Sequence, residues 1–269
     1  METVRIGSSN VSRFIIGGNP FSGFSHQGRE MDAEMLRYYT PERIKATLRE
    51  AESLGVNTAI LRADDHIRQL LTEYWDEGGG IQWFGQTASE LGSPEVSLAR
   101  VAEAGGLGCH IHGGVADNLL ANGRISELIP AVDYARQLGL TIGLAGHNPD
   151  TIRWAEQNLD VDYYMCCHYN PIARDKVAAH RAGTDERYRE EDRRAMTELI
   201  QGLSRPVIHY KILAAGRNDP AEAFEYAARS MRPGDAVCVG VYLKANPDML
   251  KEDVALLEGG LAATATGPA

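Results

Sequence analysis

The chain has 269 residues, of which 43% are hydrophobic and 24% charged, so it is long enough to bury one large core. Its net charge of −10 argues against a nucleic-acid backbone as a partner. No apolar run approaches the ~20 residues of a membrane-spanning helix, and the N-terminus has no apolar signal core. The four cysteines fit neither a disulfide framework nor a zinc knot, so we expect a cytoplasmic protein.

Short apolar segments alternate with amphipathic segments along the whole chain. A helix is predicted over Pro41–Leu54, with Thr40 as its N-cap and Gly55 just beyond its end. Further helical patterns cover Ile125–Leu138, Asp150–Asn158 and Pro220–Ser230. The predicted strands are Arg13–Gly18, Val56–Leu61, Ile81–Gln86, Leu107–His112, Thr141–Ala145, Asp162–Cys167, Pro206–Lys211 and Ala236–Val241.

Strict alternation of strands and helices predicts a parallel sheet covered by helices. We therefore expect a single α/β domain over residues 1–269, a (β/α)8 TIM barrel, with residues 259–269 as a frayed tail. The alternative is an open doubly wound sheet. It is disfavoured because no GxGxxG follows the first strand and polar residues end nearly every strand.

Histidines close four consecutive predicted strands, and in a barrel those ends point at one shared site. Imidazole is the commonest transition-metal ligand, and three histidines plus water form a usual catalytic set. This pattern predicts a divalent transition metal (Zn, Mn, Fe, Ni or Cu). The competing interpretation is a metal-free pocket that hydrogen-bonds a polyhydroxylated or anionic substrate. The candidate ligands are His110, His112, His147, His168 and His209.

Other polar residues at the strand ends are candidates for catalysis and binding. Lys211 and His112 could act as acid, base or electrostatic clamp, and Arg62 and Asp64 are further catalytic candidates. The candidate substrate ligands are Asn19, Gln86, Asn148, Tyr169 and Asn170. By contrast, we interpret His26 as an ordinary loop residue and the charged run Asp185–Arg194 as a solvated helix face.

The order of several short motifs resembles the aldo-keto reductase superfamily. Ile111-His112-Gly113 is similar to its strand-four Ile-His-Trp, and Tyr169-Asn170-Pro171 matches its strand-six Tyr-Asn-Pro. Segments Val207–Gly216 and Val239–Glu252 resemble its strand-seven and strand-eight motifs, so the resemblance covers most of the chain. It implies an aldo-keto-reductase-like TIM barrel with NADP as cofactor, Tyr210 stacked on nicotinamide, and Lys244 and Asn246 near the adenosine phosphate.

The catalytic tetrad of that family, Asp–Tyr–Lys–His, is not retained. Asn57 stands at the Asp position, Arg62 at the Tyr position and Gln86 at the Lys position, so only His112 matches. Because a barrel can keep its scaffold while exchanging its site, the fold does not restore the redox assignment.

Three functions remain open. The first is a metal-dependent, non-redox lyase, isomerase or hydrolase acting on a small hydroxyl- or carbonyl-bearing molecule. The second is an NAD(P)H-dependent oxidoreductase with an altered tetrad, in which His112 serves the carbonyl oxygen and Lys211 supplies the proton. The third is a non-catalytic barrel that binds a ligand. A small molecule is the expected partner in each, and a homo-oligomer is possible.

Overall fold

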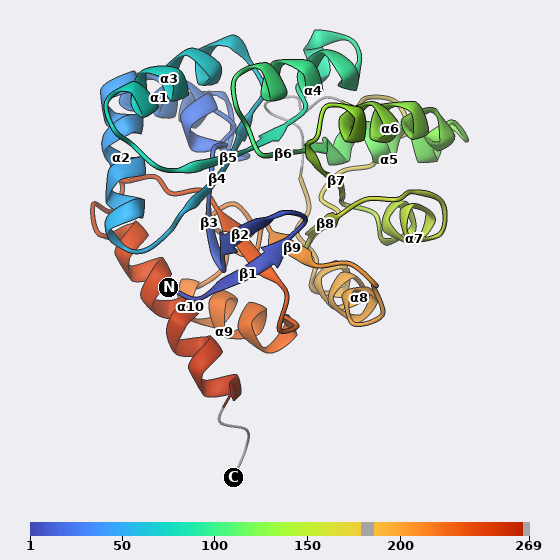
Figure 1. Ribbon diagram of the computed structural model, residues 1–269. Helices are drawn as coiled ribbons and strands as arrows, with labels where there is room; N and C mark the ends of the chain where they lie inside the picture. The colour runs from blue at the N-terminus through green and yellow to red at the C-terminus, as the bar shows by residue number, and fades with distance from the viewer. Residues whose placement is uncertain (179–185, 266–269) are drawn as a thin grey trace.

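Eight parallel strands close into a barrel in the computed structural model, which describes residues 1–178 and 186–265 (Figure 1). The closed order β10-β3-β4-β5-β6-β7-β8-β9 follows the chain and confirms the predicted TIM barrel. The barrel strands are β3 (Phe14–Gly17), β4 (Thr58–Arg62), β5 (Gln82–Gln86), β6 (Gly108–Ile111), β7 (Thr141–Gly146), β8 (Tyr163–Cys167), β9 (Val207–Tyr210) and β10 (Ala236–Val239).

Helices surround the barrel and bury their apolar faces against the outer side of the strands (Figure 1). None of the described helices has both the length and the apolar character needed to cross a bilayer. The helices are α1 (Arg29–Tyr38), α2 (Pro41–Ser53), α3 (Asp65–Asp76), α4 (Pro94–Glu103), α5 (Gly113–Ala121), α6 (Ile129–Gln137), α7 (Pro149–Asn158), α8 (Glu190–Ile200), α9 (Pro220–Ser230) and α10 (Met249–Ala265), with short 3-10 turns at Pro20–Ser22, Ser89–Leu91 and Ile125–Leu128.

Helix α2 shows how local sequence sets these elements. The Thr40 side chain accepts a hydrogen bond from the Arg43 backbone N–H, and Pro41 occupies the first turn, as predicted. Gly55 follows the helix with φ +79°, a left-handed conformation that glycine adopts without strain. The chain then enters the barrel through the buried Val56.

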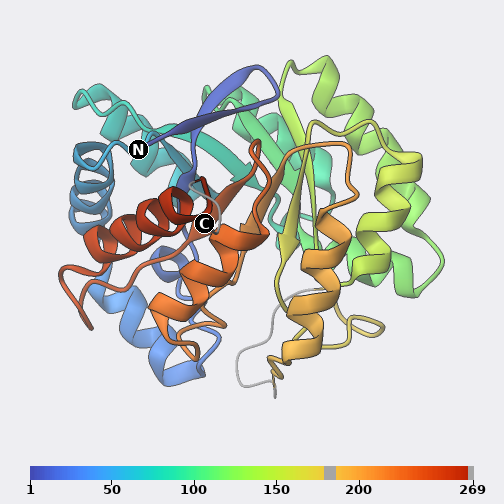
Figure 2. The ribbon, with the colours of Figure 1, turned by 90° about the horizontal axis from the view of Figure 1, so that it is seen from below.

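An N-terminal hairpin, which the sequence analysis did not predict, covers one end of the barrel. Strands β1 (Thr3–Ile6) and β2 (Ser9–Ser12) pair antiparallel, with Val4 opposite Val11. These two side chains and Ile6 join the cluster that fills the barrel interior with Ile15 and other strand residues. Figure 2 shows the hairpin at one end of the barrel and helix α1 at the other.

The segment predicted to be a frayed tail is helical for most of its length. Helix α10 continues to Ala265, so residues 259–265 are helical, and residues 266–269 lie outside the described part. The helix packs along α9, where a side chain at Gly260 would approach the Ala228 Cβ within 2.8 Å. Packing against α9 therefore orders a segment whose composition alone suggested disorder.

Candidate active site

A cavity of about 830 Å³ opens at the C-terminal ends of the barrel strands, away from the hairpin. Its volume lies in the range of small-molecule sites, and its position is the one that active sites occupy in TIM barrels. Many of the polar residues singled out in the sequence contribute to its wall. These are Asn19, Arg62, Gln86, His110, His112, His147, Tyr210, Lys211 and Lys244.

Two histidines of strand β6 and its end present unpaired ring nitrogens in this region. His110 lies inside the barrel, where burial lowers its pKa to about 3. His112 caps the start of helix α5, and burial, followed by the nearby His147, lowers its pKa well below the usual value. Among the described residues, His110 Nε2 and His112 Nδ1 are buried without a hydrogen-bond partner. Both imidazoles are therefore held neutral in the cavity wall.

His147, at the end of β7, is held by a carboxylate that the sequence analysis missed. Its Nδ1–H donates to Asp117 Oδ2 at 2.8 Å, and its backbone N–H donates to the same carboxylate. Thr151 Oγ1 and the Asn148 backbone N–H also donate to Asp117, which is 4% exposed. Burial lowers the pKa of His147, although Asp117 opposes that shift.

Asp117 thus fixes the ring orientation and tautomer of His147, which lines the cavity. The sequence did contain one clue to Asp117: it is the sole charged residue of the otherwise neutral segment Gly113–Ala121. A glycine at the start of this helix makes room for the arrangement. A Cβ at Gly113 would lie 3.1 Å from the His147 ring and 3.1 Å from the Tyr210 hydroxyl.

Lys211, at the end of β9, belongs to a chain of three side chains from distant segments. Its Nζ donates to His26 Nε2 at 2.8 Å, and His26 Nδ1 lies 2.9 Å from Glu186 Oε1. Tyr188 donates its hydroxyl to Glu186 at 2.6 Å. Burial lowers the pKa of Lys211, opposed by the nearby Cys167 and Glu186.

The contacts of His26 and Glu186 correct two interpretations made from the sequence. His26 is no ordinary loop residue, because its side chain is 9% exposed and lies between Lys211 and Glu186. In the charged run, residue 185 lies outside the described part, but the Glu186 side chain is 3% exposed and α8 begins only at Glu190. The sequence analysis missed this contact because His26 and Glu186 lie in loops and are 160 positions apart in the sequence.

Hydrogen bonds join the two loops that carry His26 and Lys211. Gln27 Nε2 donates to the Ala215 carbonyl at 2.8 Å, and Arg217 donates to the carbonyls of His26 and Ala214. The described non-glycine residues with positive φ all lie in these two loops. They are His26, Lys211, Ala214 and Ala215, with φ between +49° and +57°. Such backbone conformations cost energy and persist where surrounding contacts enforce them.

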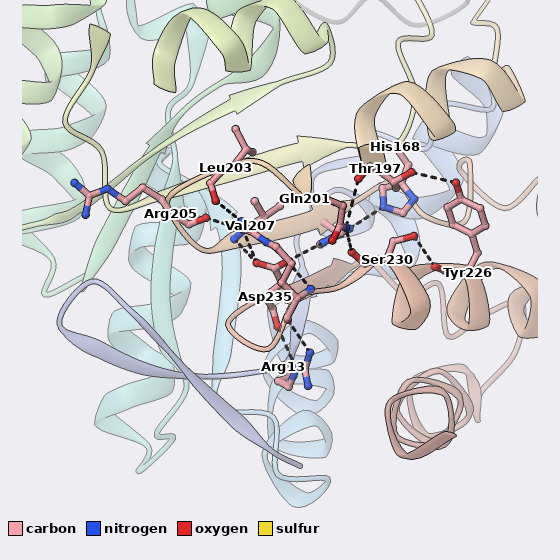
Figure 3. A network of polar contacts seen from close by, with 12 residues as sticks. Arg13, His168, Thr197, Gln201, Leu203, Arg205, Val207, Tyr226, Ser230 and Asp235 are labelled. Atoms are coloured by element: carbon pink, nitrogen blue, oxygen red, sulfur yellow. Dashed lines mark hydrogen bonds and ion pairs between the residues drawn. The ribbon is translucent and has the colours of Figure 1, made fainter. Parts of the chain in front are cut away.

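His168 and His209 do not face the cavity, which contradicts their predicted role as ligands of a shared metal. They lie on the outer side of β8 and β9, where His168 Nε2 is 3.0 Å from His209 Nδ1. Figure 3 shows His168 beside Tyr226 of α9 and Asp235 in the same polar network. Side chains alternate along a strand, so Tyr210 faces the cavity and its neighbour His209 faces outward. Within the described residues, no three His, Cys, Asp or Glu side chains are grouped to hold a metal.

Two other predicted site residues, Asp64 and Asn148, are not part of the cavity wall and have structural partners. Asp64 caps α3 through the Ile67 N–H and pairs with Arg62, which also contacts Glu90. Asn148 caps α7.

The remaining departures lie just before β4, just after β8 and in the segment after β10. Tyr169 accepts a hydrogen bond from Asn218 Nδ2, and Asn170 is not part of the cavity wall. Asn246 donates to Glu252 and also lies outside that wall. Asn57 accepts a hydrogen bond from the hairpin residue Ser12, so the tetrad aspartate has no counterpart in the cavity.

The fold is similar to solved structures of aldo-keto reductases. A Pseudomonas aeruginosa protein described as a candidate aldo-keto reductase matches with a TM-score of 0.64 and 18% identity, over 96% of this chain and 95% of that chain. An aldo-keto reductase from Bacillus halodurans in its holo form matches with a TM-score of 0.58 and 15% identity, over 96% and 91%.

A truncated 3-deoxy-D-arabino-heptulosonate 7-phosphate synthase from Thermotoga maritima also has a TM-score of 0.58, at 13% identity over 98% of this chain and 92% of that chain. No protein-family profile matches the chain, and neither does any curated protein. At these identities the likeness shows the fold, an aldo-keto-reductase-like TIM barrel.

The metal-dependent lyase, isomerase or hydrolase predicted from the sequence is therefore wrong. Several solved structures with a similar fold are named as reductases, and among the described residues no group of side chains is arranged to hold a metal. The predicted metal ligands are also divided between the two sides of the barrel wall, because His168 and His209 face outward. Five histidines at consecutive strand ends thus do not converge on one point.

Proposed function

We propose that this protein is an NAD(P)H-dependent oxidoreductase that reduces the carbonyl group of a small molecule. The observation that carries the proposal is that Tyr210, His112 and Lys211 line one cavity of an aldo-keto-reductase-like barrel. The resemblance assigns the Tyr210 ring to the nicotinamide and His112 to the carbonyl oxygen. Lys211 then replaces the missing tyrosine as proton donor.

The chemistry of the cavity fits a nicotinamide and a carbonyl substrate. The partly buried His112 ring lines the cavity and can hydrogen-bond a ligand, and the Tyr210 ring offers a flat surface. Toward the segment after β10, Lys244 lines the cavity but pairs with Glu34 at 3.0 Å. Lys244 is thus the proposed contact for the phosphate-bearing half of the cofactor, and Asn246 is not part of the proposal.

The protein groups divide the remaining work of a reduction. A bound nicotinamide cofactor would supply the hydride. His112, kept neutral by its lowered pKa, would hold the carbonyl oxygen by a hydrogen bond. Lys211, whose lowered pKa eases loss of a proton, would transfer that proton to the oxygen as negative charge develops on it.

The proposed substrate class rests on the polar groups of the wall near Arg62, and Arg174 is a further cation of that wall. Arg62 is already paired with Asp64 and Glu90, so it is a poor site for an additional anion. Asn19, Gln86 and His147 offer neutral hydrogen-bonding groups. These features support a small, uncharged, hydroxyl-bearing aldehyde or ketone, and they leave Asp64 as a structural residue.

Fluorescence titration with NADH and NADPH tests the proposal, followed by absorbance assays of cofactor oxidation with a panel of hydroxyaldehydes and hydroxyketones. Tyr210→Ala should weaken cofactor binding about tenfold, because it removes the stacking surface. Tyr134→Ala on α6, away from the cavity, is the matched control. The proposal would be refuted if the folded wild-type protein bound neither NADH nor NADPH.

A further inference from the structure

The contacts of Lys211 match the general arrangement of an activated nucleophile. In such sites a nucleophile is hydrogen-bonded to a base, and a third group orients the base. Here the Lys211 Nζ lies 2.8 Å from His26 Nε2, and Glu186 lies 2.9 Å and 3.0 Å from His26 Nδ1. With its Nδ1 proton directed at Glu186, His26 presents the Nε2 lone pair to the lysine.

We propose that Lys211 is a nucleophilic amine that forms a covalent imine with an aldehyde or ketone in the cavity, with His26 as its base and Glu186 as the residue that positions His26. The inference shares with the proposed function the cavity, the residue Lys211 and the carbonyl class of the substrate. It requires no nicotinamide. When protonated, the amine can donate to a carbonyl oxygen, and when deprotonated it can attack the carbonyl carbon.

The steps balance without an oxidant or reductant. His26 Nε2 takes a proton from the Lys211 ammonium, and Glu186 stabilises the imidazolium that results. The free Nζ lone pair attacks the carbonyl carbon, and a proton moves from Nζ to the former carbonyl oxygen, which gives a carbinolamine. His26 then returns its proton to that hydroxyl, water leaves, and a protonated imine remains on Lys211.

The surrounding structure holds the amine in place for this chemistry. Lys211 and His26 both have left-handed backbones, with φ +56° and +57°, and Arg217 ties the His26 carbonyl to the loop after β9. Such conformations persist where surrounding contacts enforce them. The contacts between the two loops thus hold the lysine and the base in the cavity wall that both line.

Reductive trapping tests the inference on the wild-type protein. The protein is incubated with limiting glycolaldehyde and sodium cyanoborohydride, without nicotinamide, and labelled lysines are located by peptide mass spectrometry. Lys211 should be labelled several-fold faster than the other lysines, because His26 Nε2 is placed to take a proton from its amine. The internal controls are Lys45, Lys176, Lys244 and Lys251.

Two variants distinguish the proposed roles of His26 and Glu186 in catalysis from a role in packing alone. His26→Gln should slow labelling of Lys211 while the thermal melt stays close to that of the wild type, and Glu186→Gln should slow it less. His66→Gln, an exposed histidine of α3, is the matched control. Equal labelling of all five lysines, or unchanged labelling in His26→Gln, would overturn the inference. A protein that traps glycolaldehyde on Lys211 but binds no nicotinamide would refute the proposed reductase and retain the imine.

Discussion

Asp117 supplies the sharpest test of how the site is held together. Its buried carboxylate accepts hydrogen bonds from the His147 ring, the backbone N–H groups of His147 and Asn148, and Thr151 Oγ1. Asp117→Asn leaves one amide oxygen as an acceptor and turns N–H groups toward the remaining donors. A hydrogen bond to a charged group contributes about 1.5–3 kcal/mol, so the variant should lose about 3 kcal/mol of unfolding free energy.

Urea unfolding followed by circular dichroism measures this loss. In a chain of this size, about 3 kcal/mol corresponds to a melting temperature lower by roughly 6–12 °C. Asp150→Asn is the matched control, because the Asp150 side chain is 68% exposed and its ion pair with Arg153 contributes at most about 1 kcal/mol. Nitrogen NMR of the His147 ring should also show loss of the fixed Nδ1–H tautomer. A loss below about 1 kcal/mol in Asp117→Asn would refute the view that this carboxylate organises the site.

Three further substitutions probe separate features. Gly113→Ala places a Cβ 3.1 Å from the His147 ring, so carbonyl reduction should fall several-fold with little change in melting temperature; unchanged kcat/KM would contradict this. Burial raises the Asp253 pKa from 3.8 to about 7, so its folding penalty is absent below pH 4 and grows as pH rises to 7. Asp253→Asn should therefore stabilise the protein at pH 8 by up to about 4 kcal/mol and not at pH 4, and equal melting shifts at both values would count against it. His168→Gln disturbs the contact with His209 and should lower stability by about 1–3 kcal/mol while cofactor binding stays unchanged; weaker binding would place His168 in the site after all.

The barrel could be predicted because its signals are local. Each strand is a short apolar run, and caps such as Thr40 and glycines such as Gly55 mark helix ends wherever they occur. The hairpin was missed because Thr3–Ile6 and Ser9–Ser12 are only four residues each, and five of these eight residues are polar. Its place is set by packing against the barrel interior, which no local pattern records.

The site was predicted in outline and misread in detail. Strand ends located the cavity wall, but a shift of one residue along β9 decides whether His209 or Tyr210 faces it. His26 and Glu186 come from loops whose meeting depends on tertiary structure. Counting the histidines at strand ends therefore overestimated how many of them meet at one point. The count ignored the side of the strand on which each ring lies.

The N-terminal hairpin also constrains the kinetics of the reaction in the cavity, because it covers the other end of the barrel. Since Val4, Ile6 and Val11 fill one end, the opening that the described residues leave toward His110 lies at the C-terminal ends of the strands. Two ligands that both pass through this opening cannot exchange independently, and the one seated deeper must arrive first and leave last. Steady-state measurements with two varied ligands should then show compulsory-order binding, with the last product released competing directly with the first ligand bound.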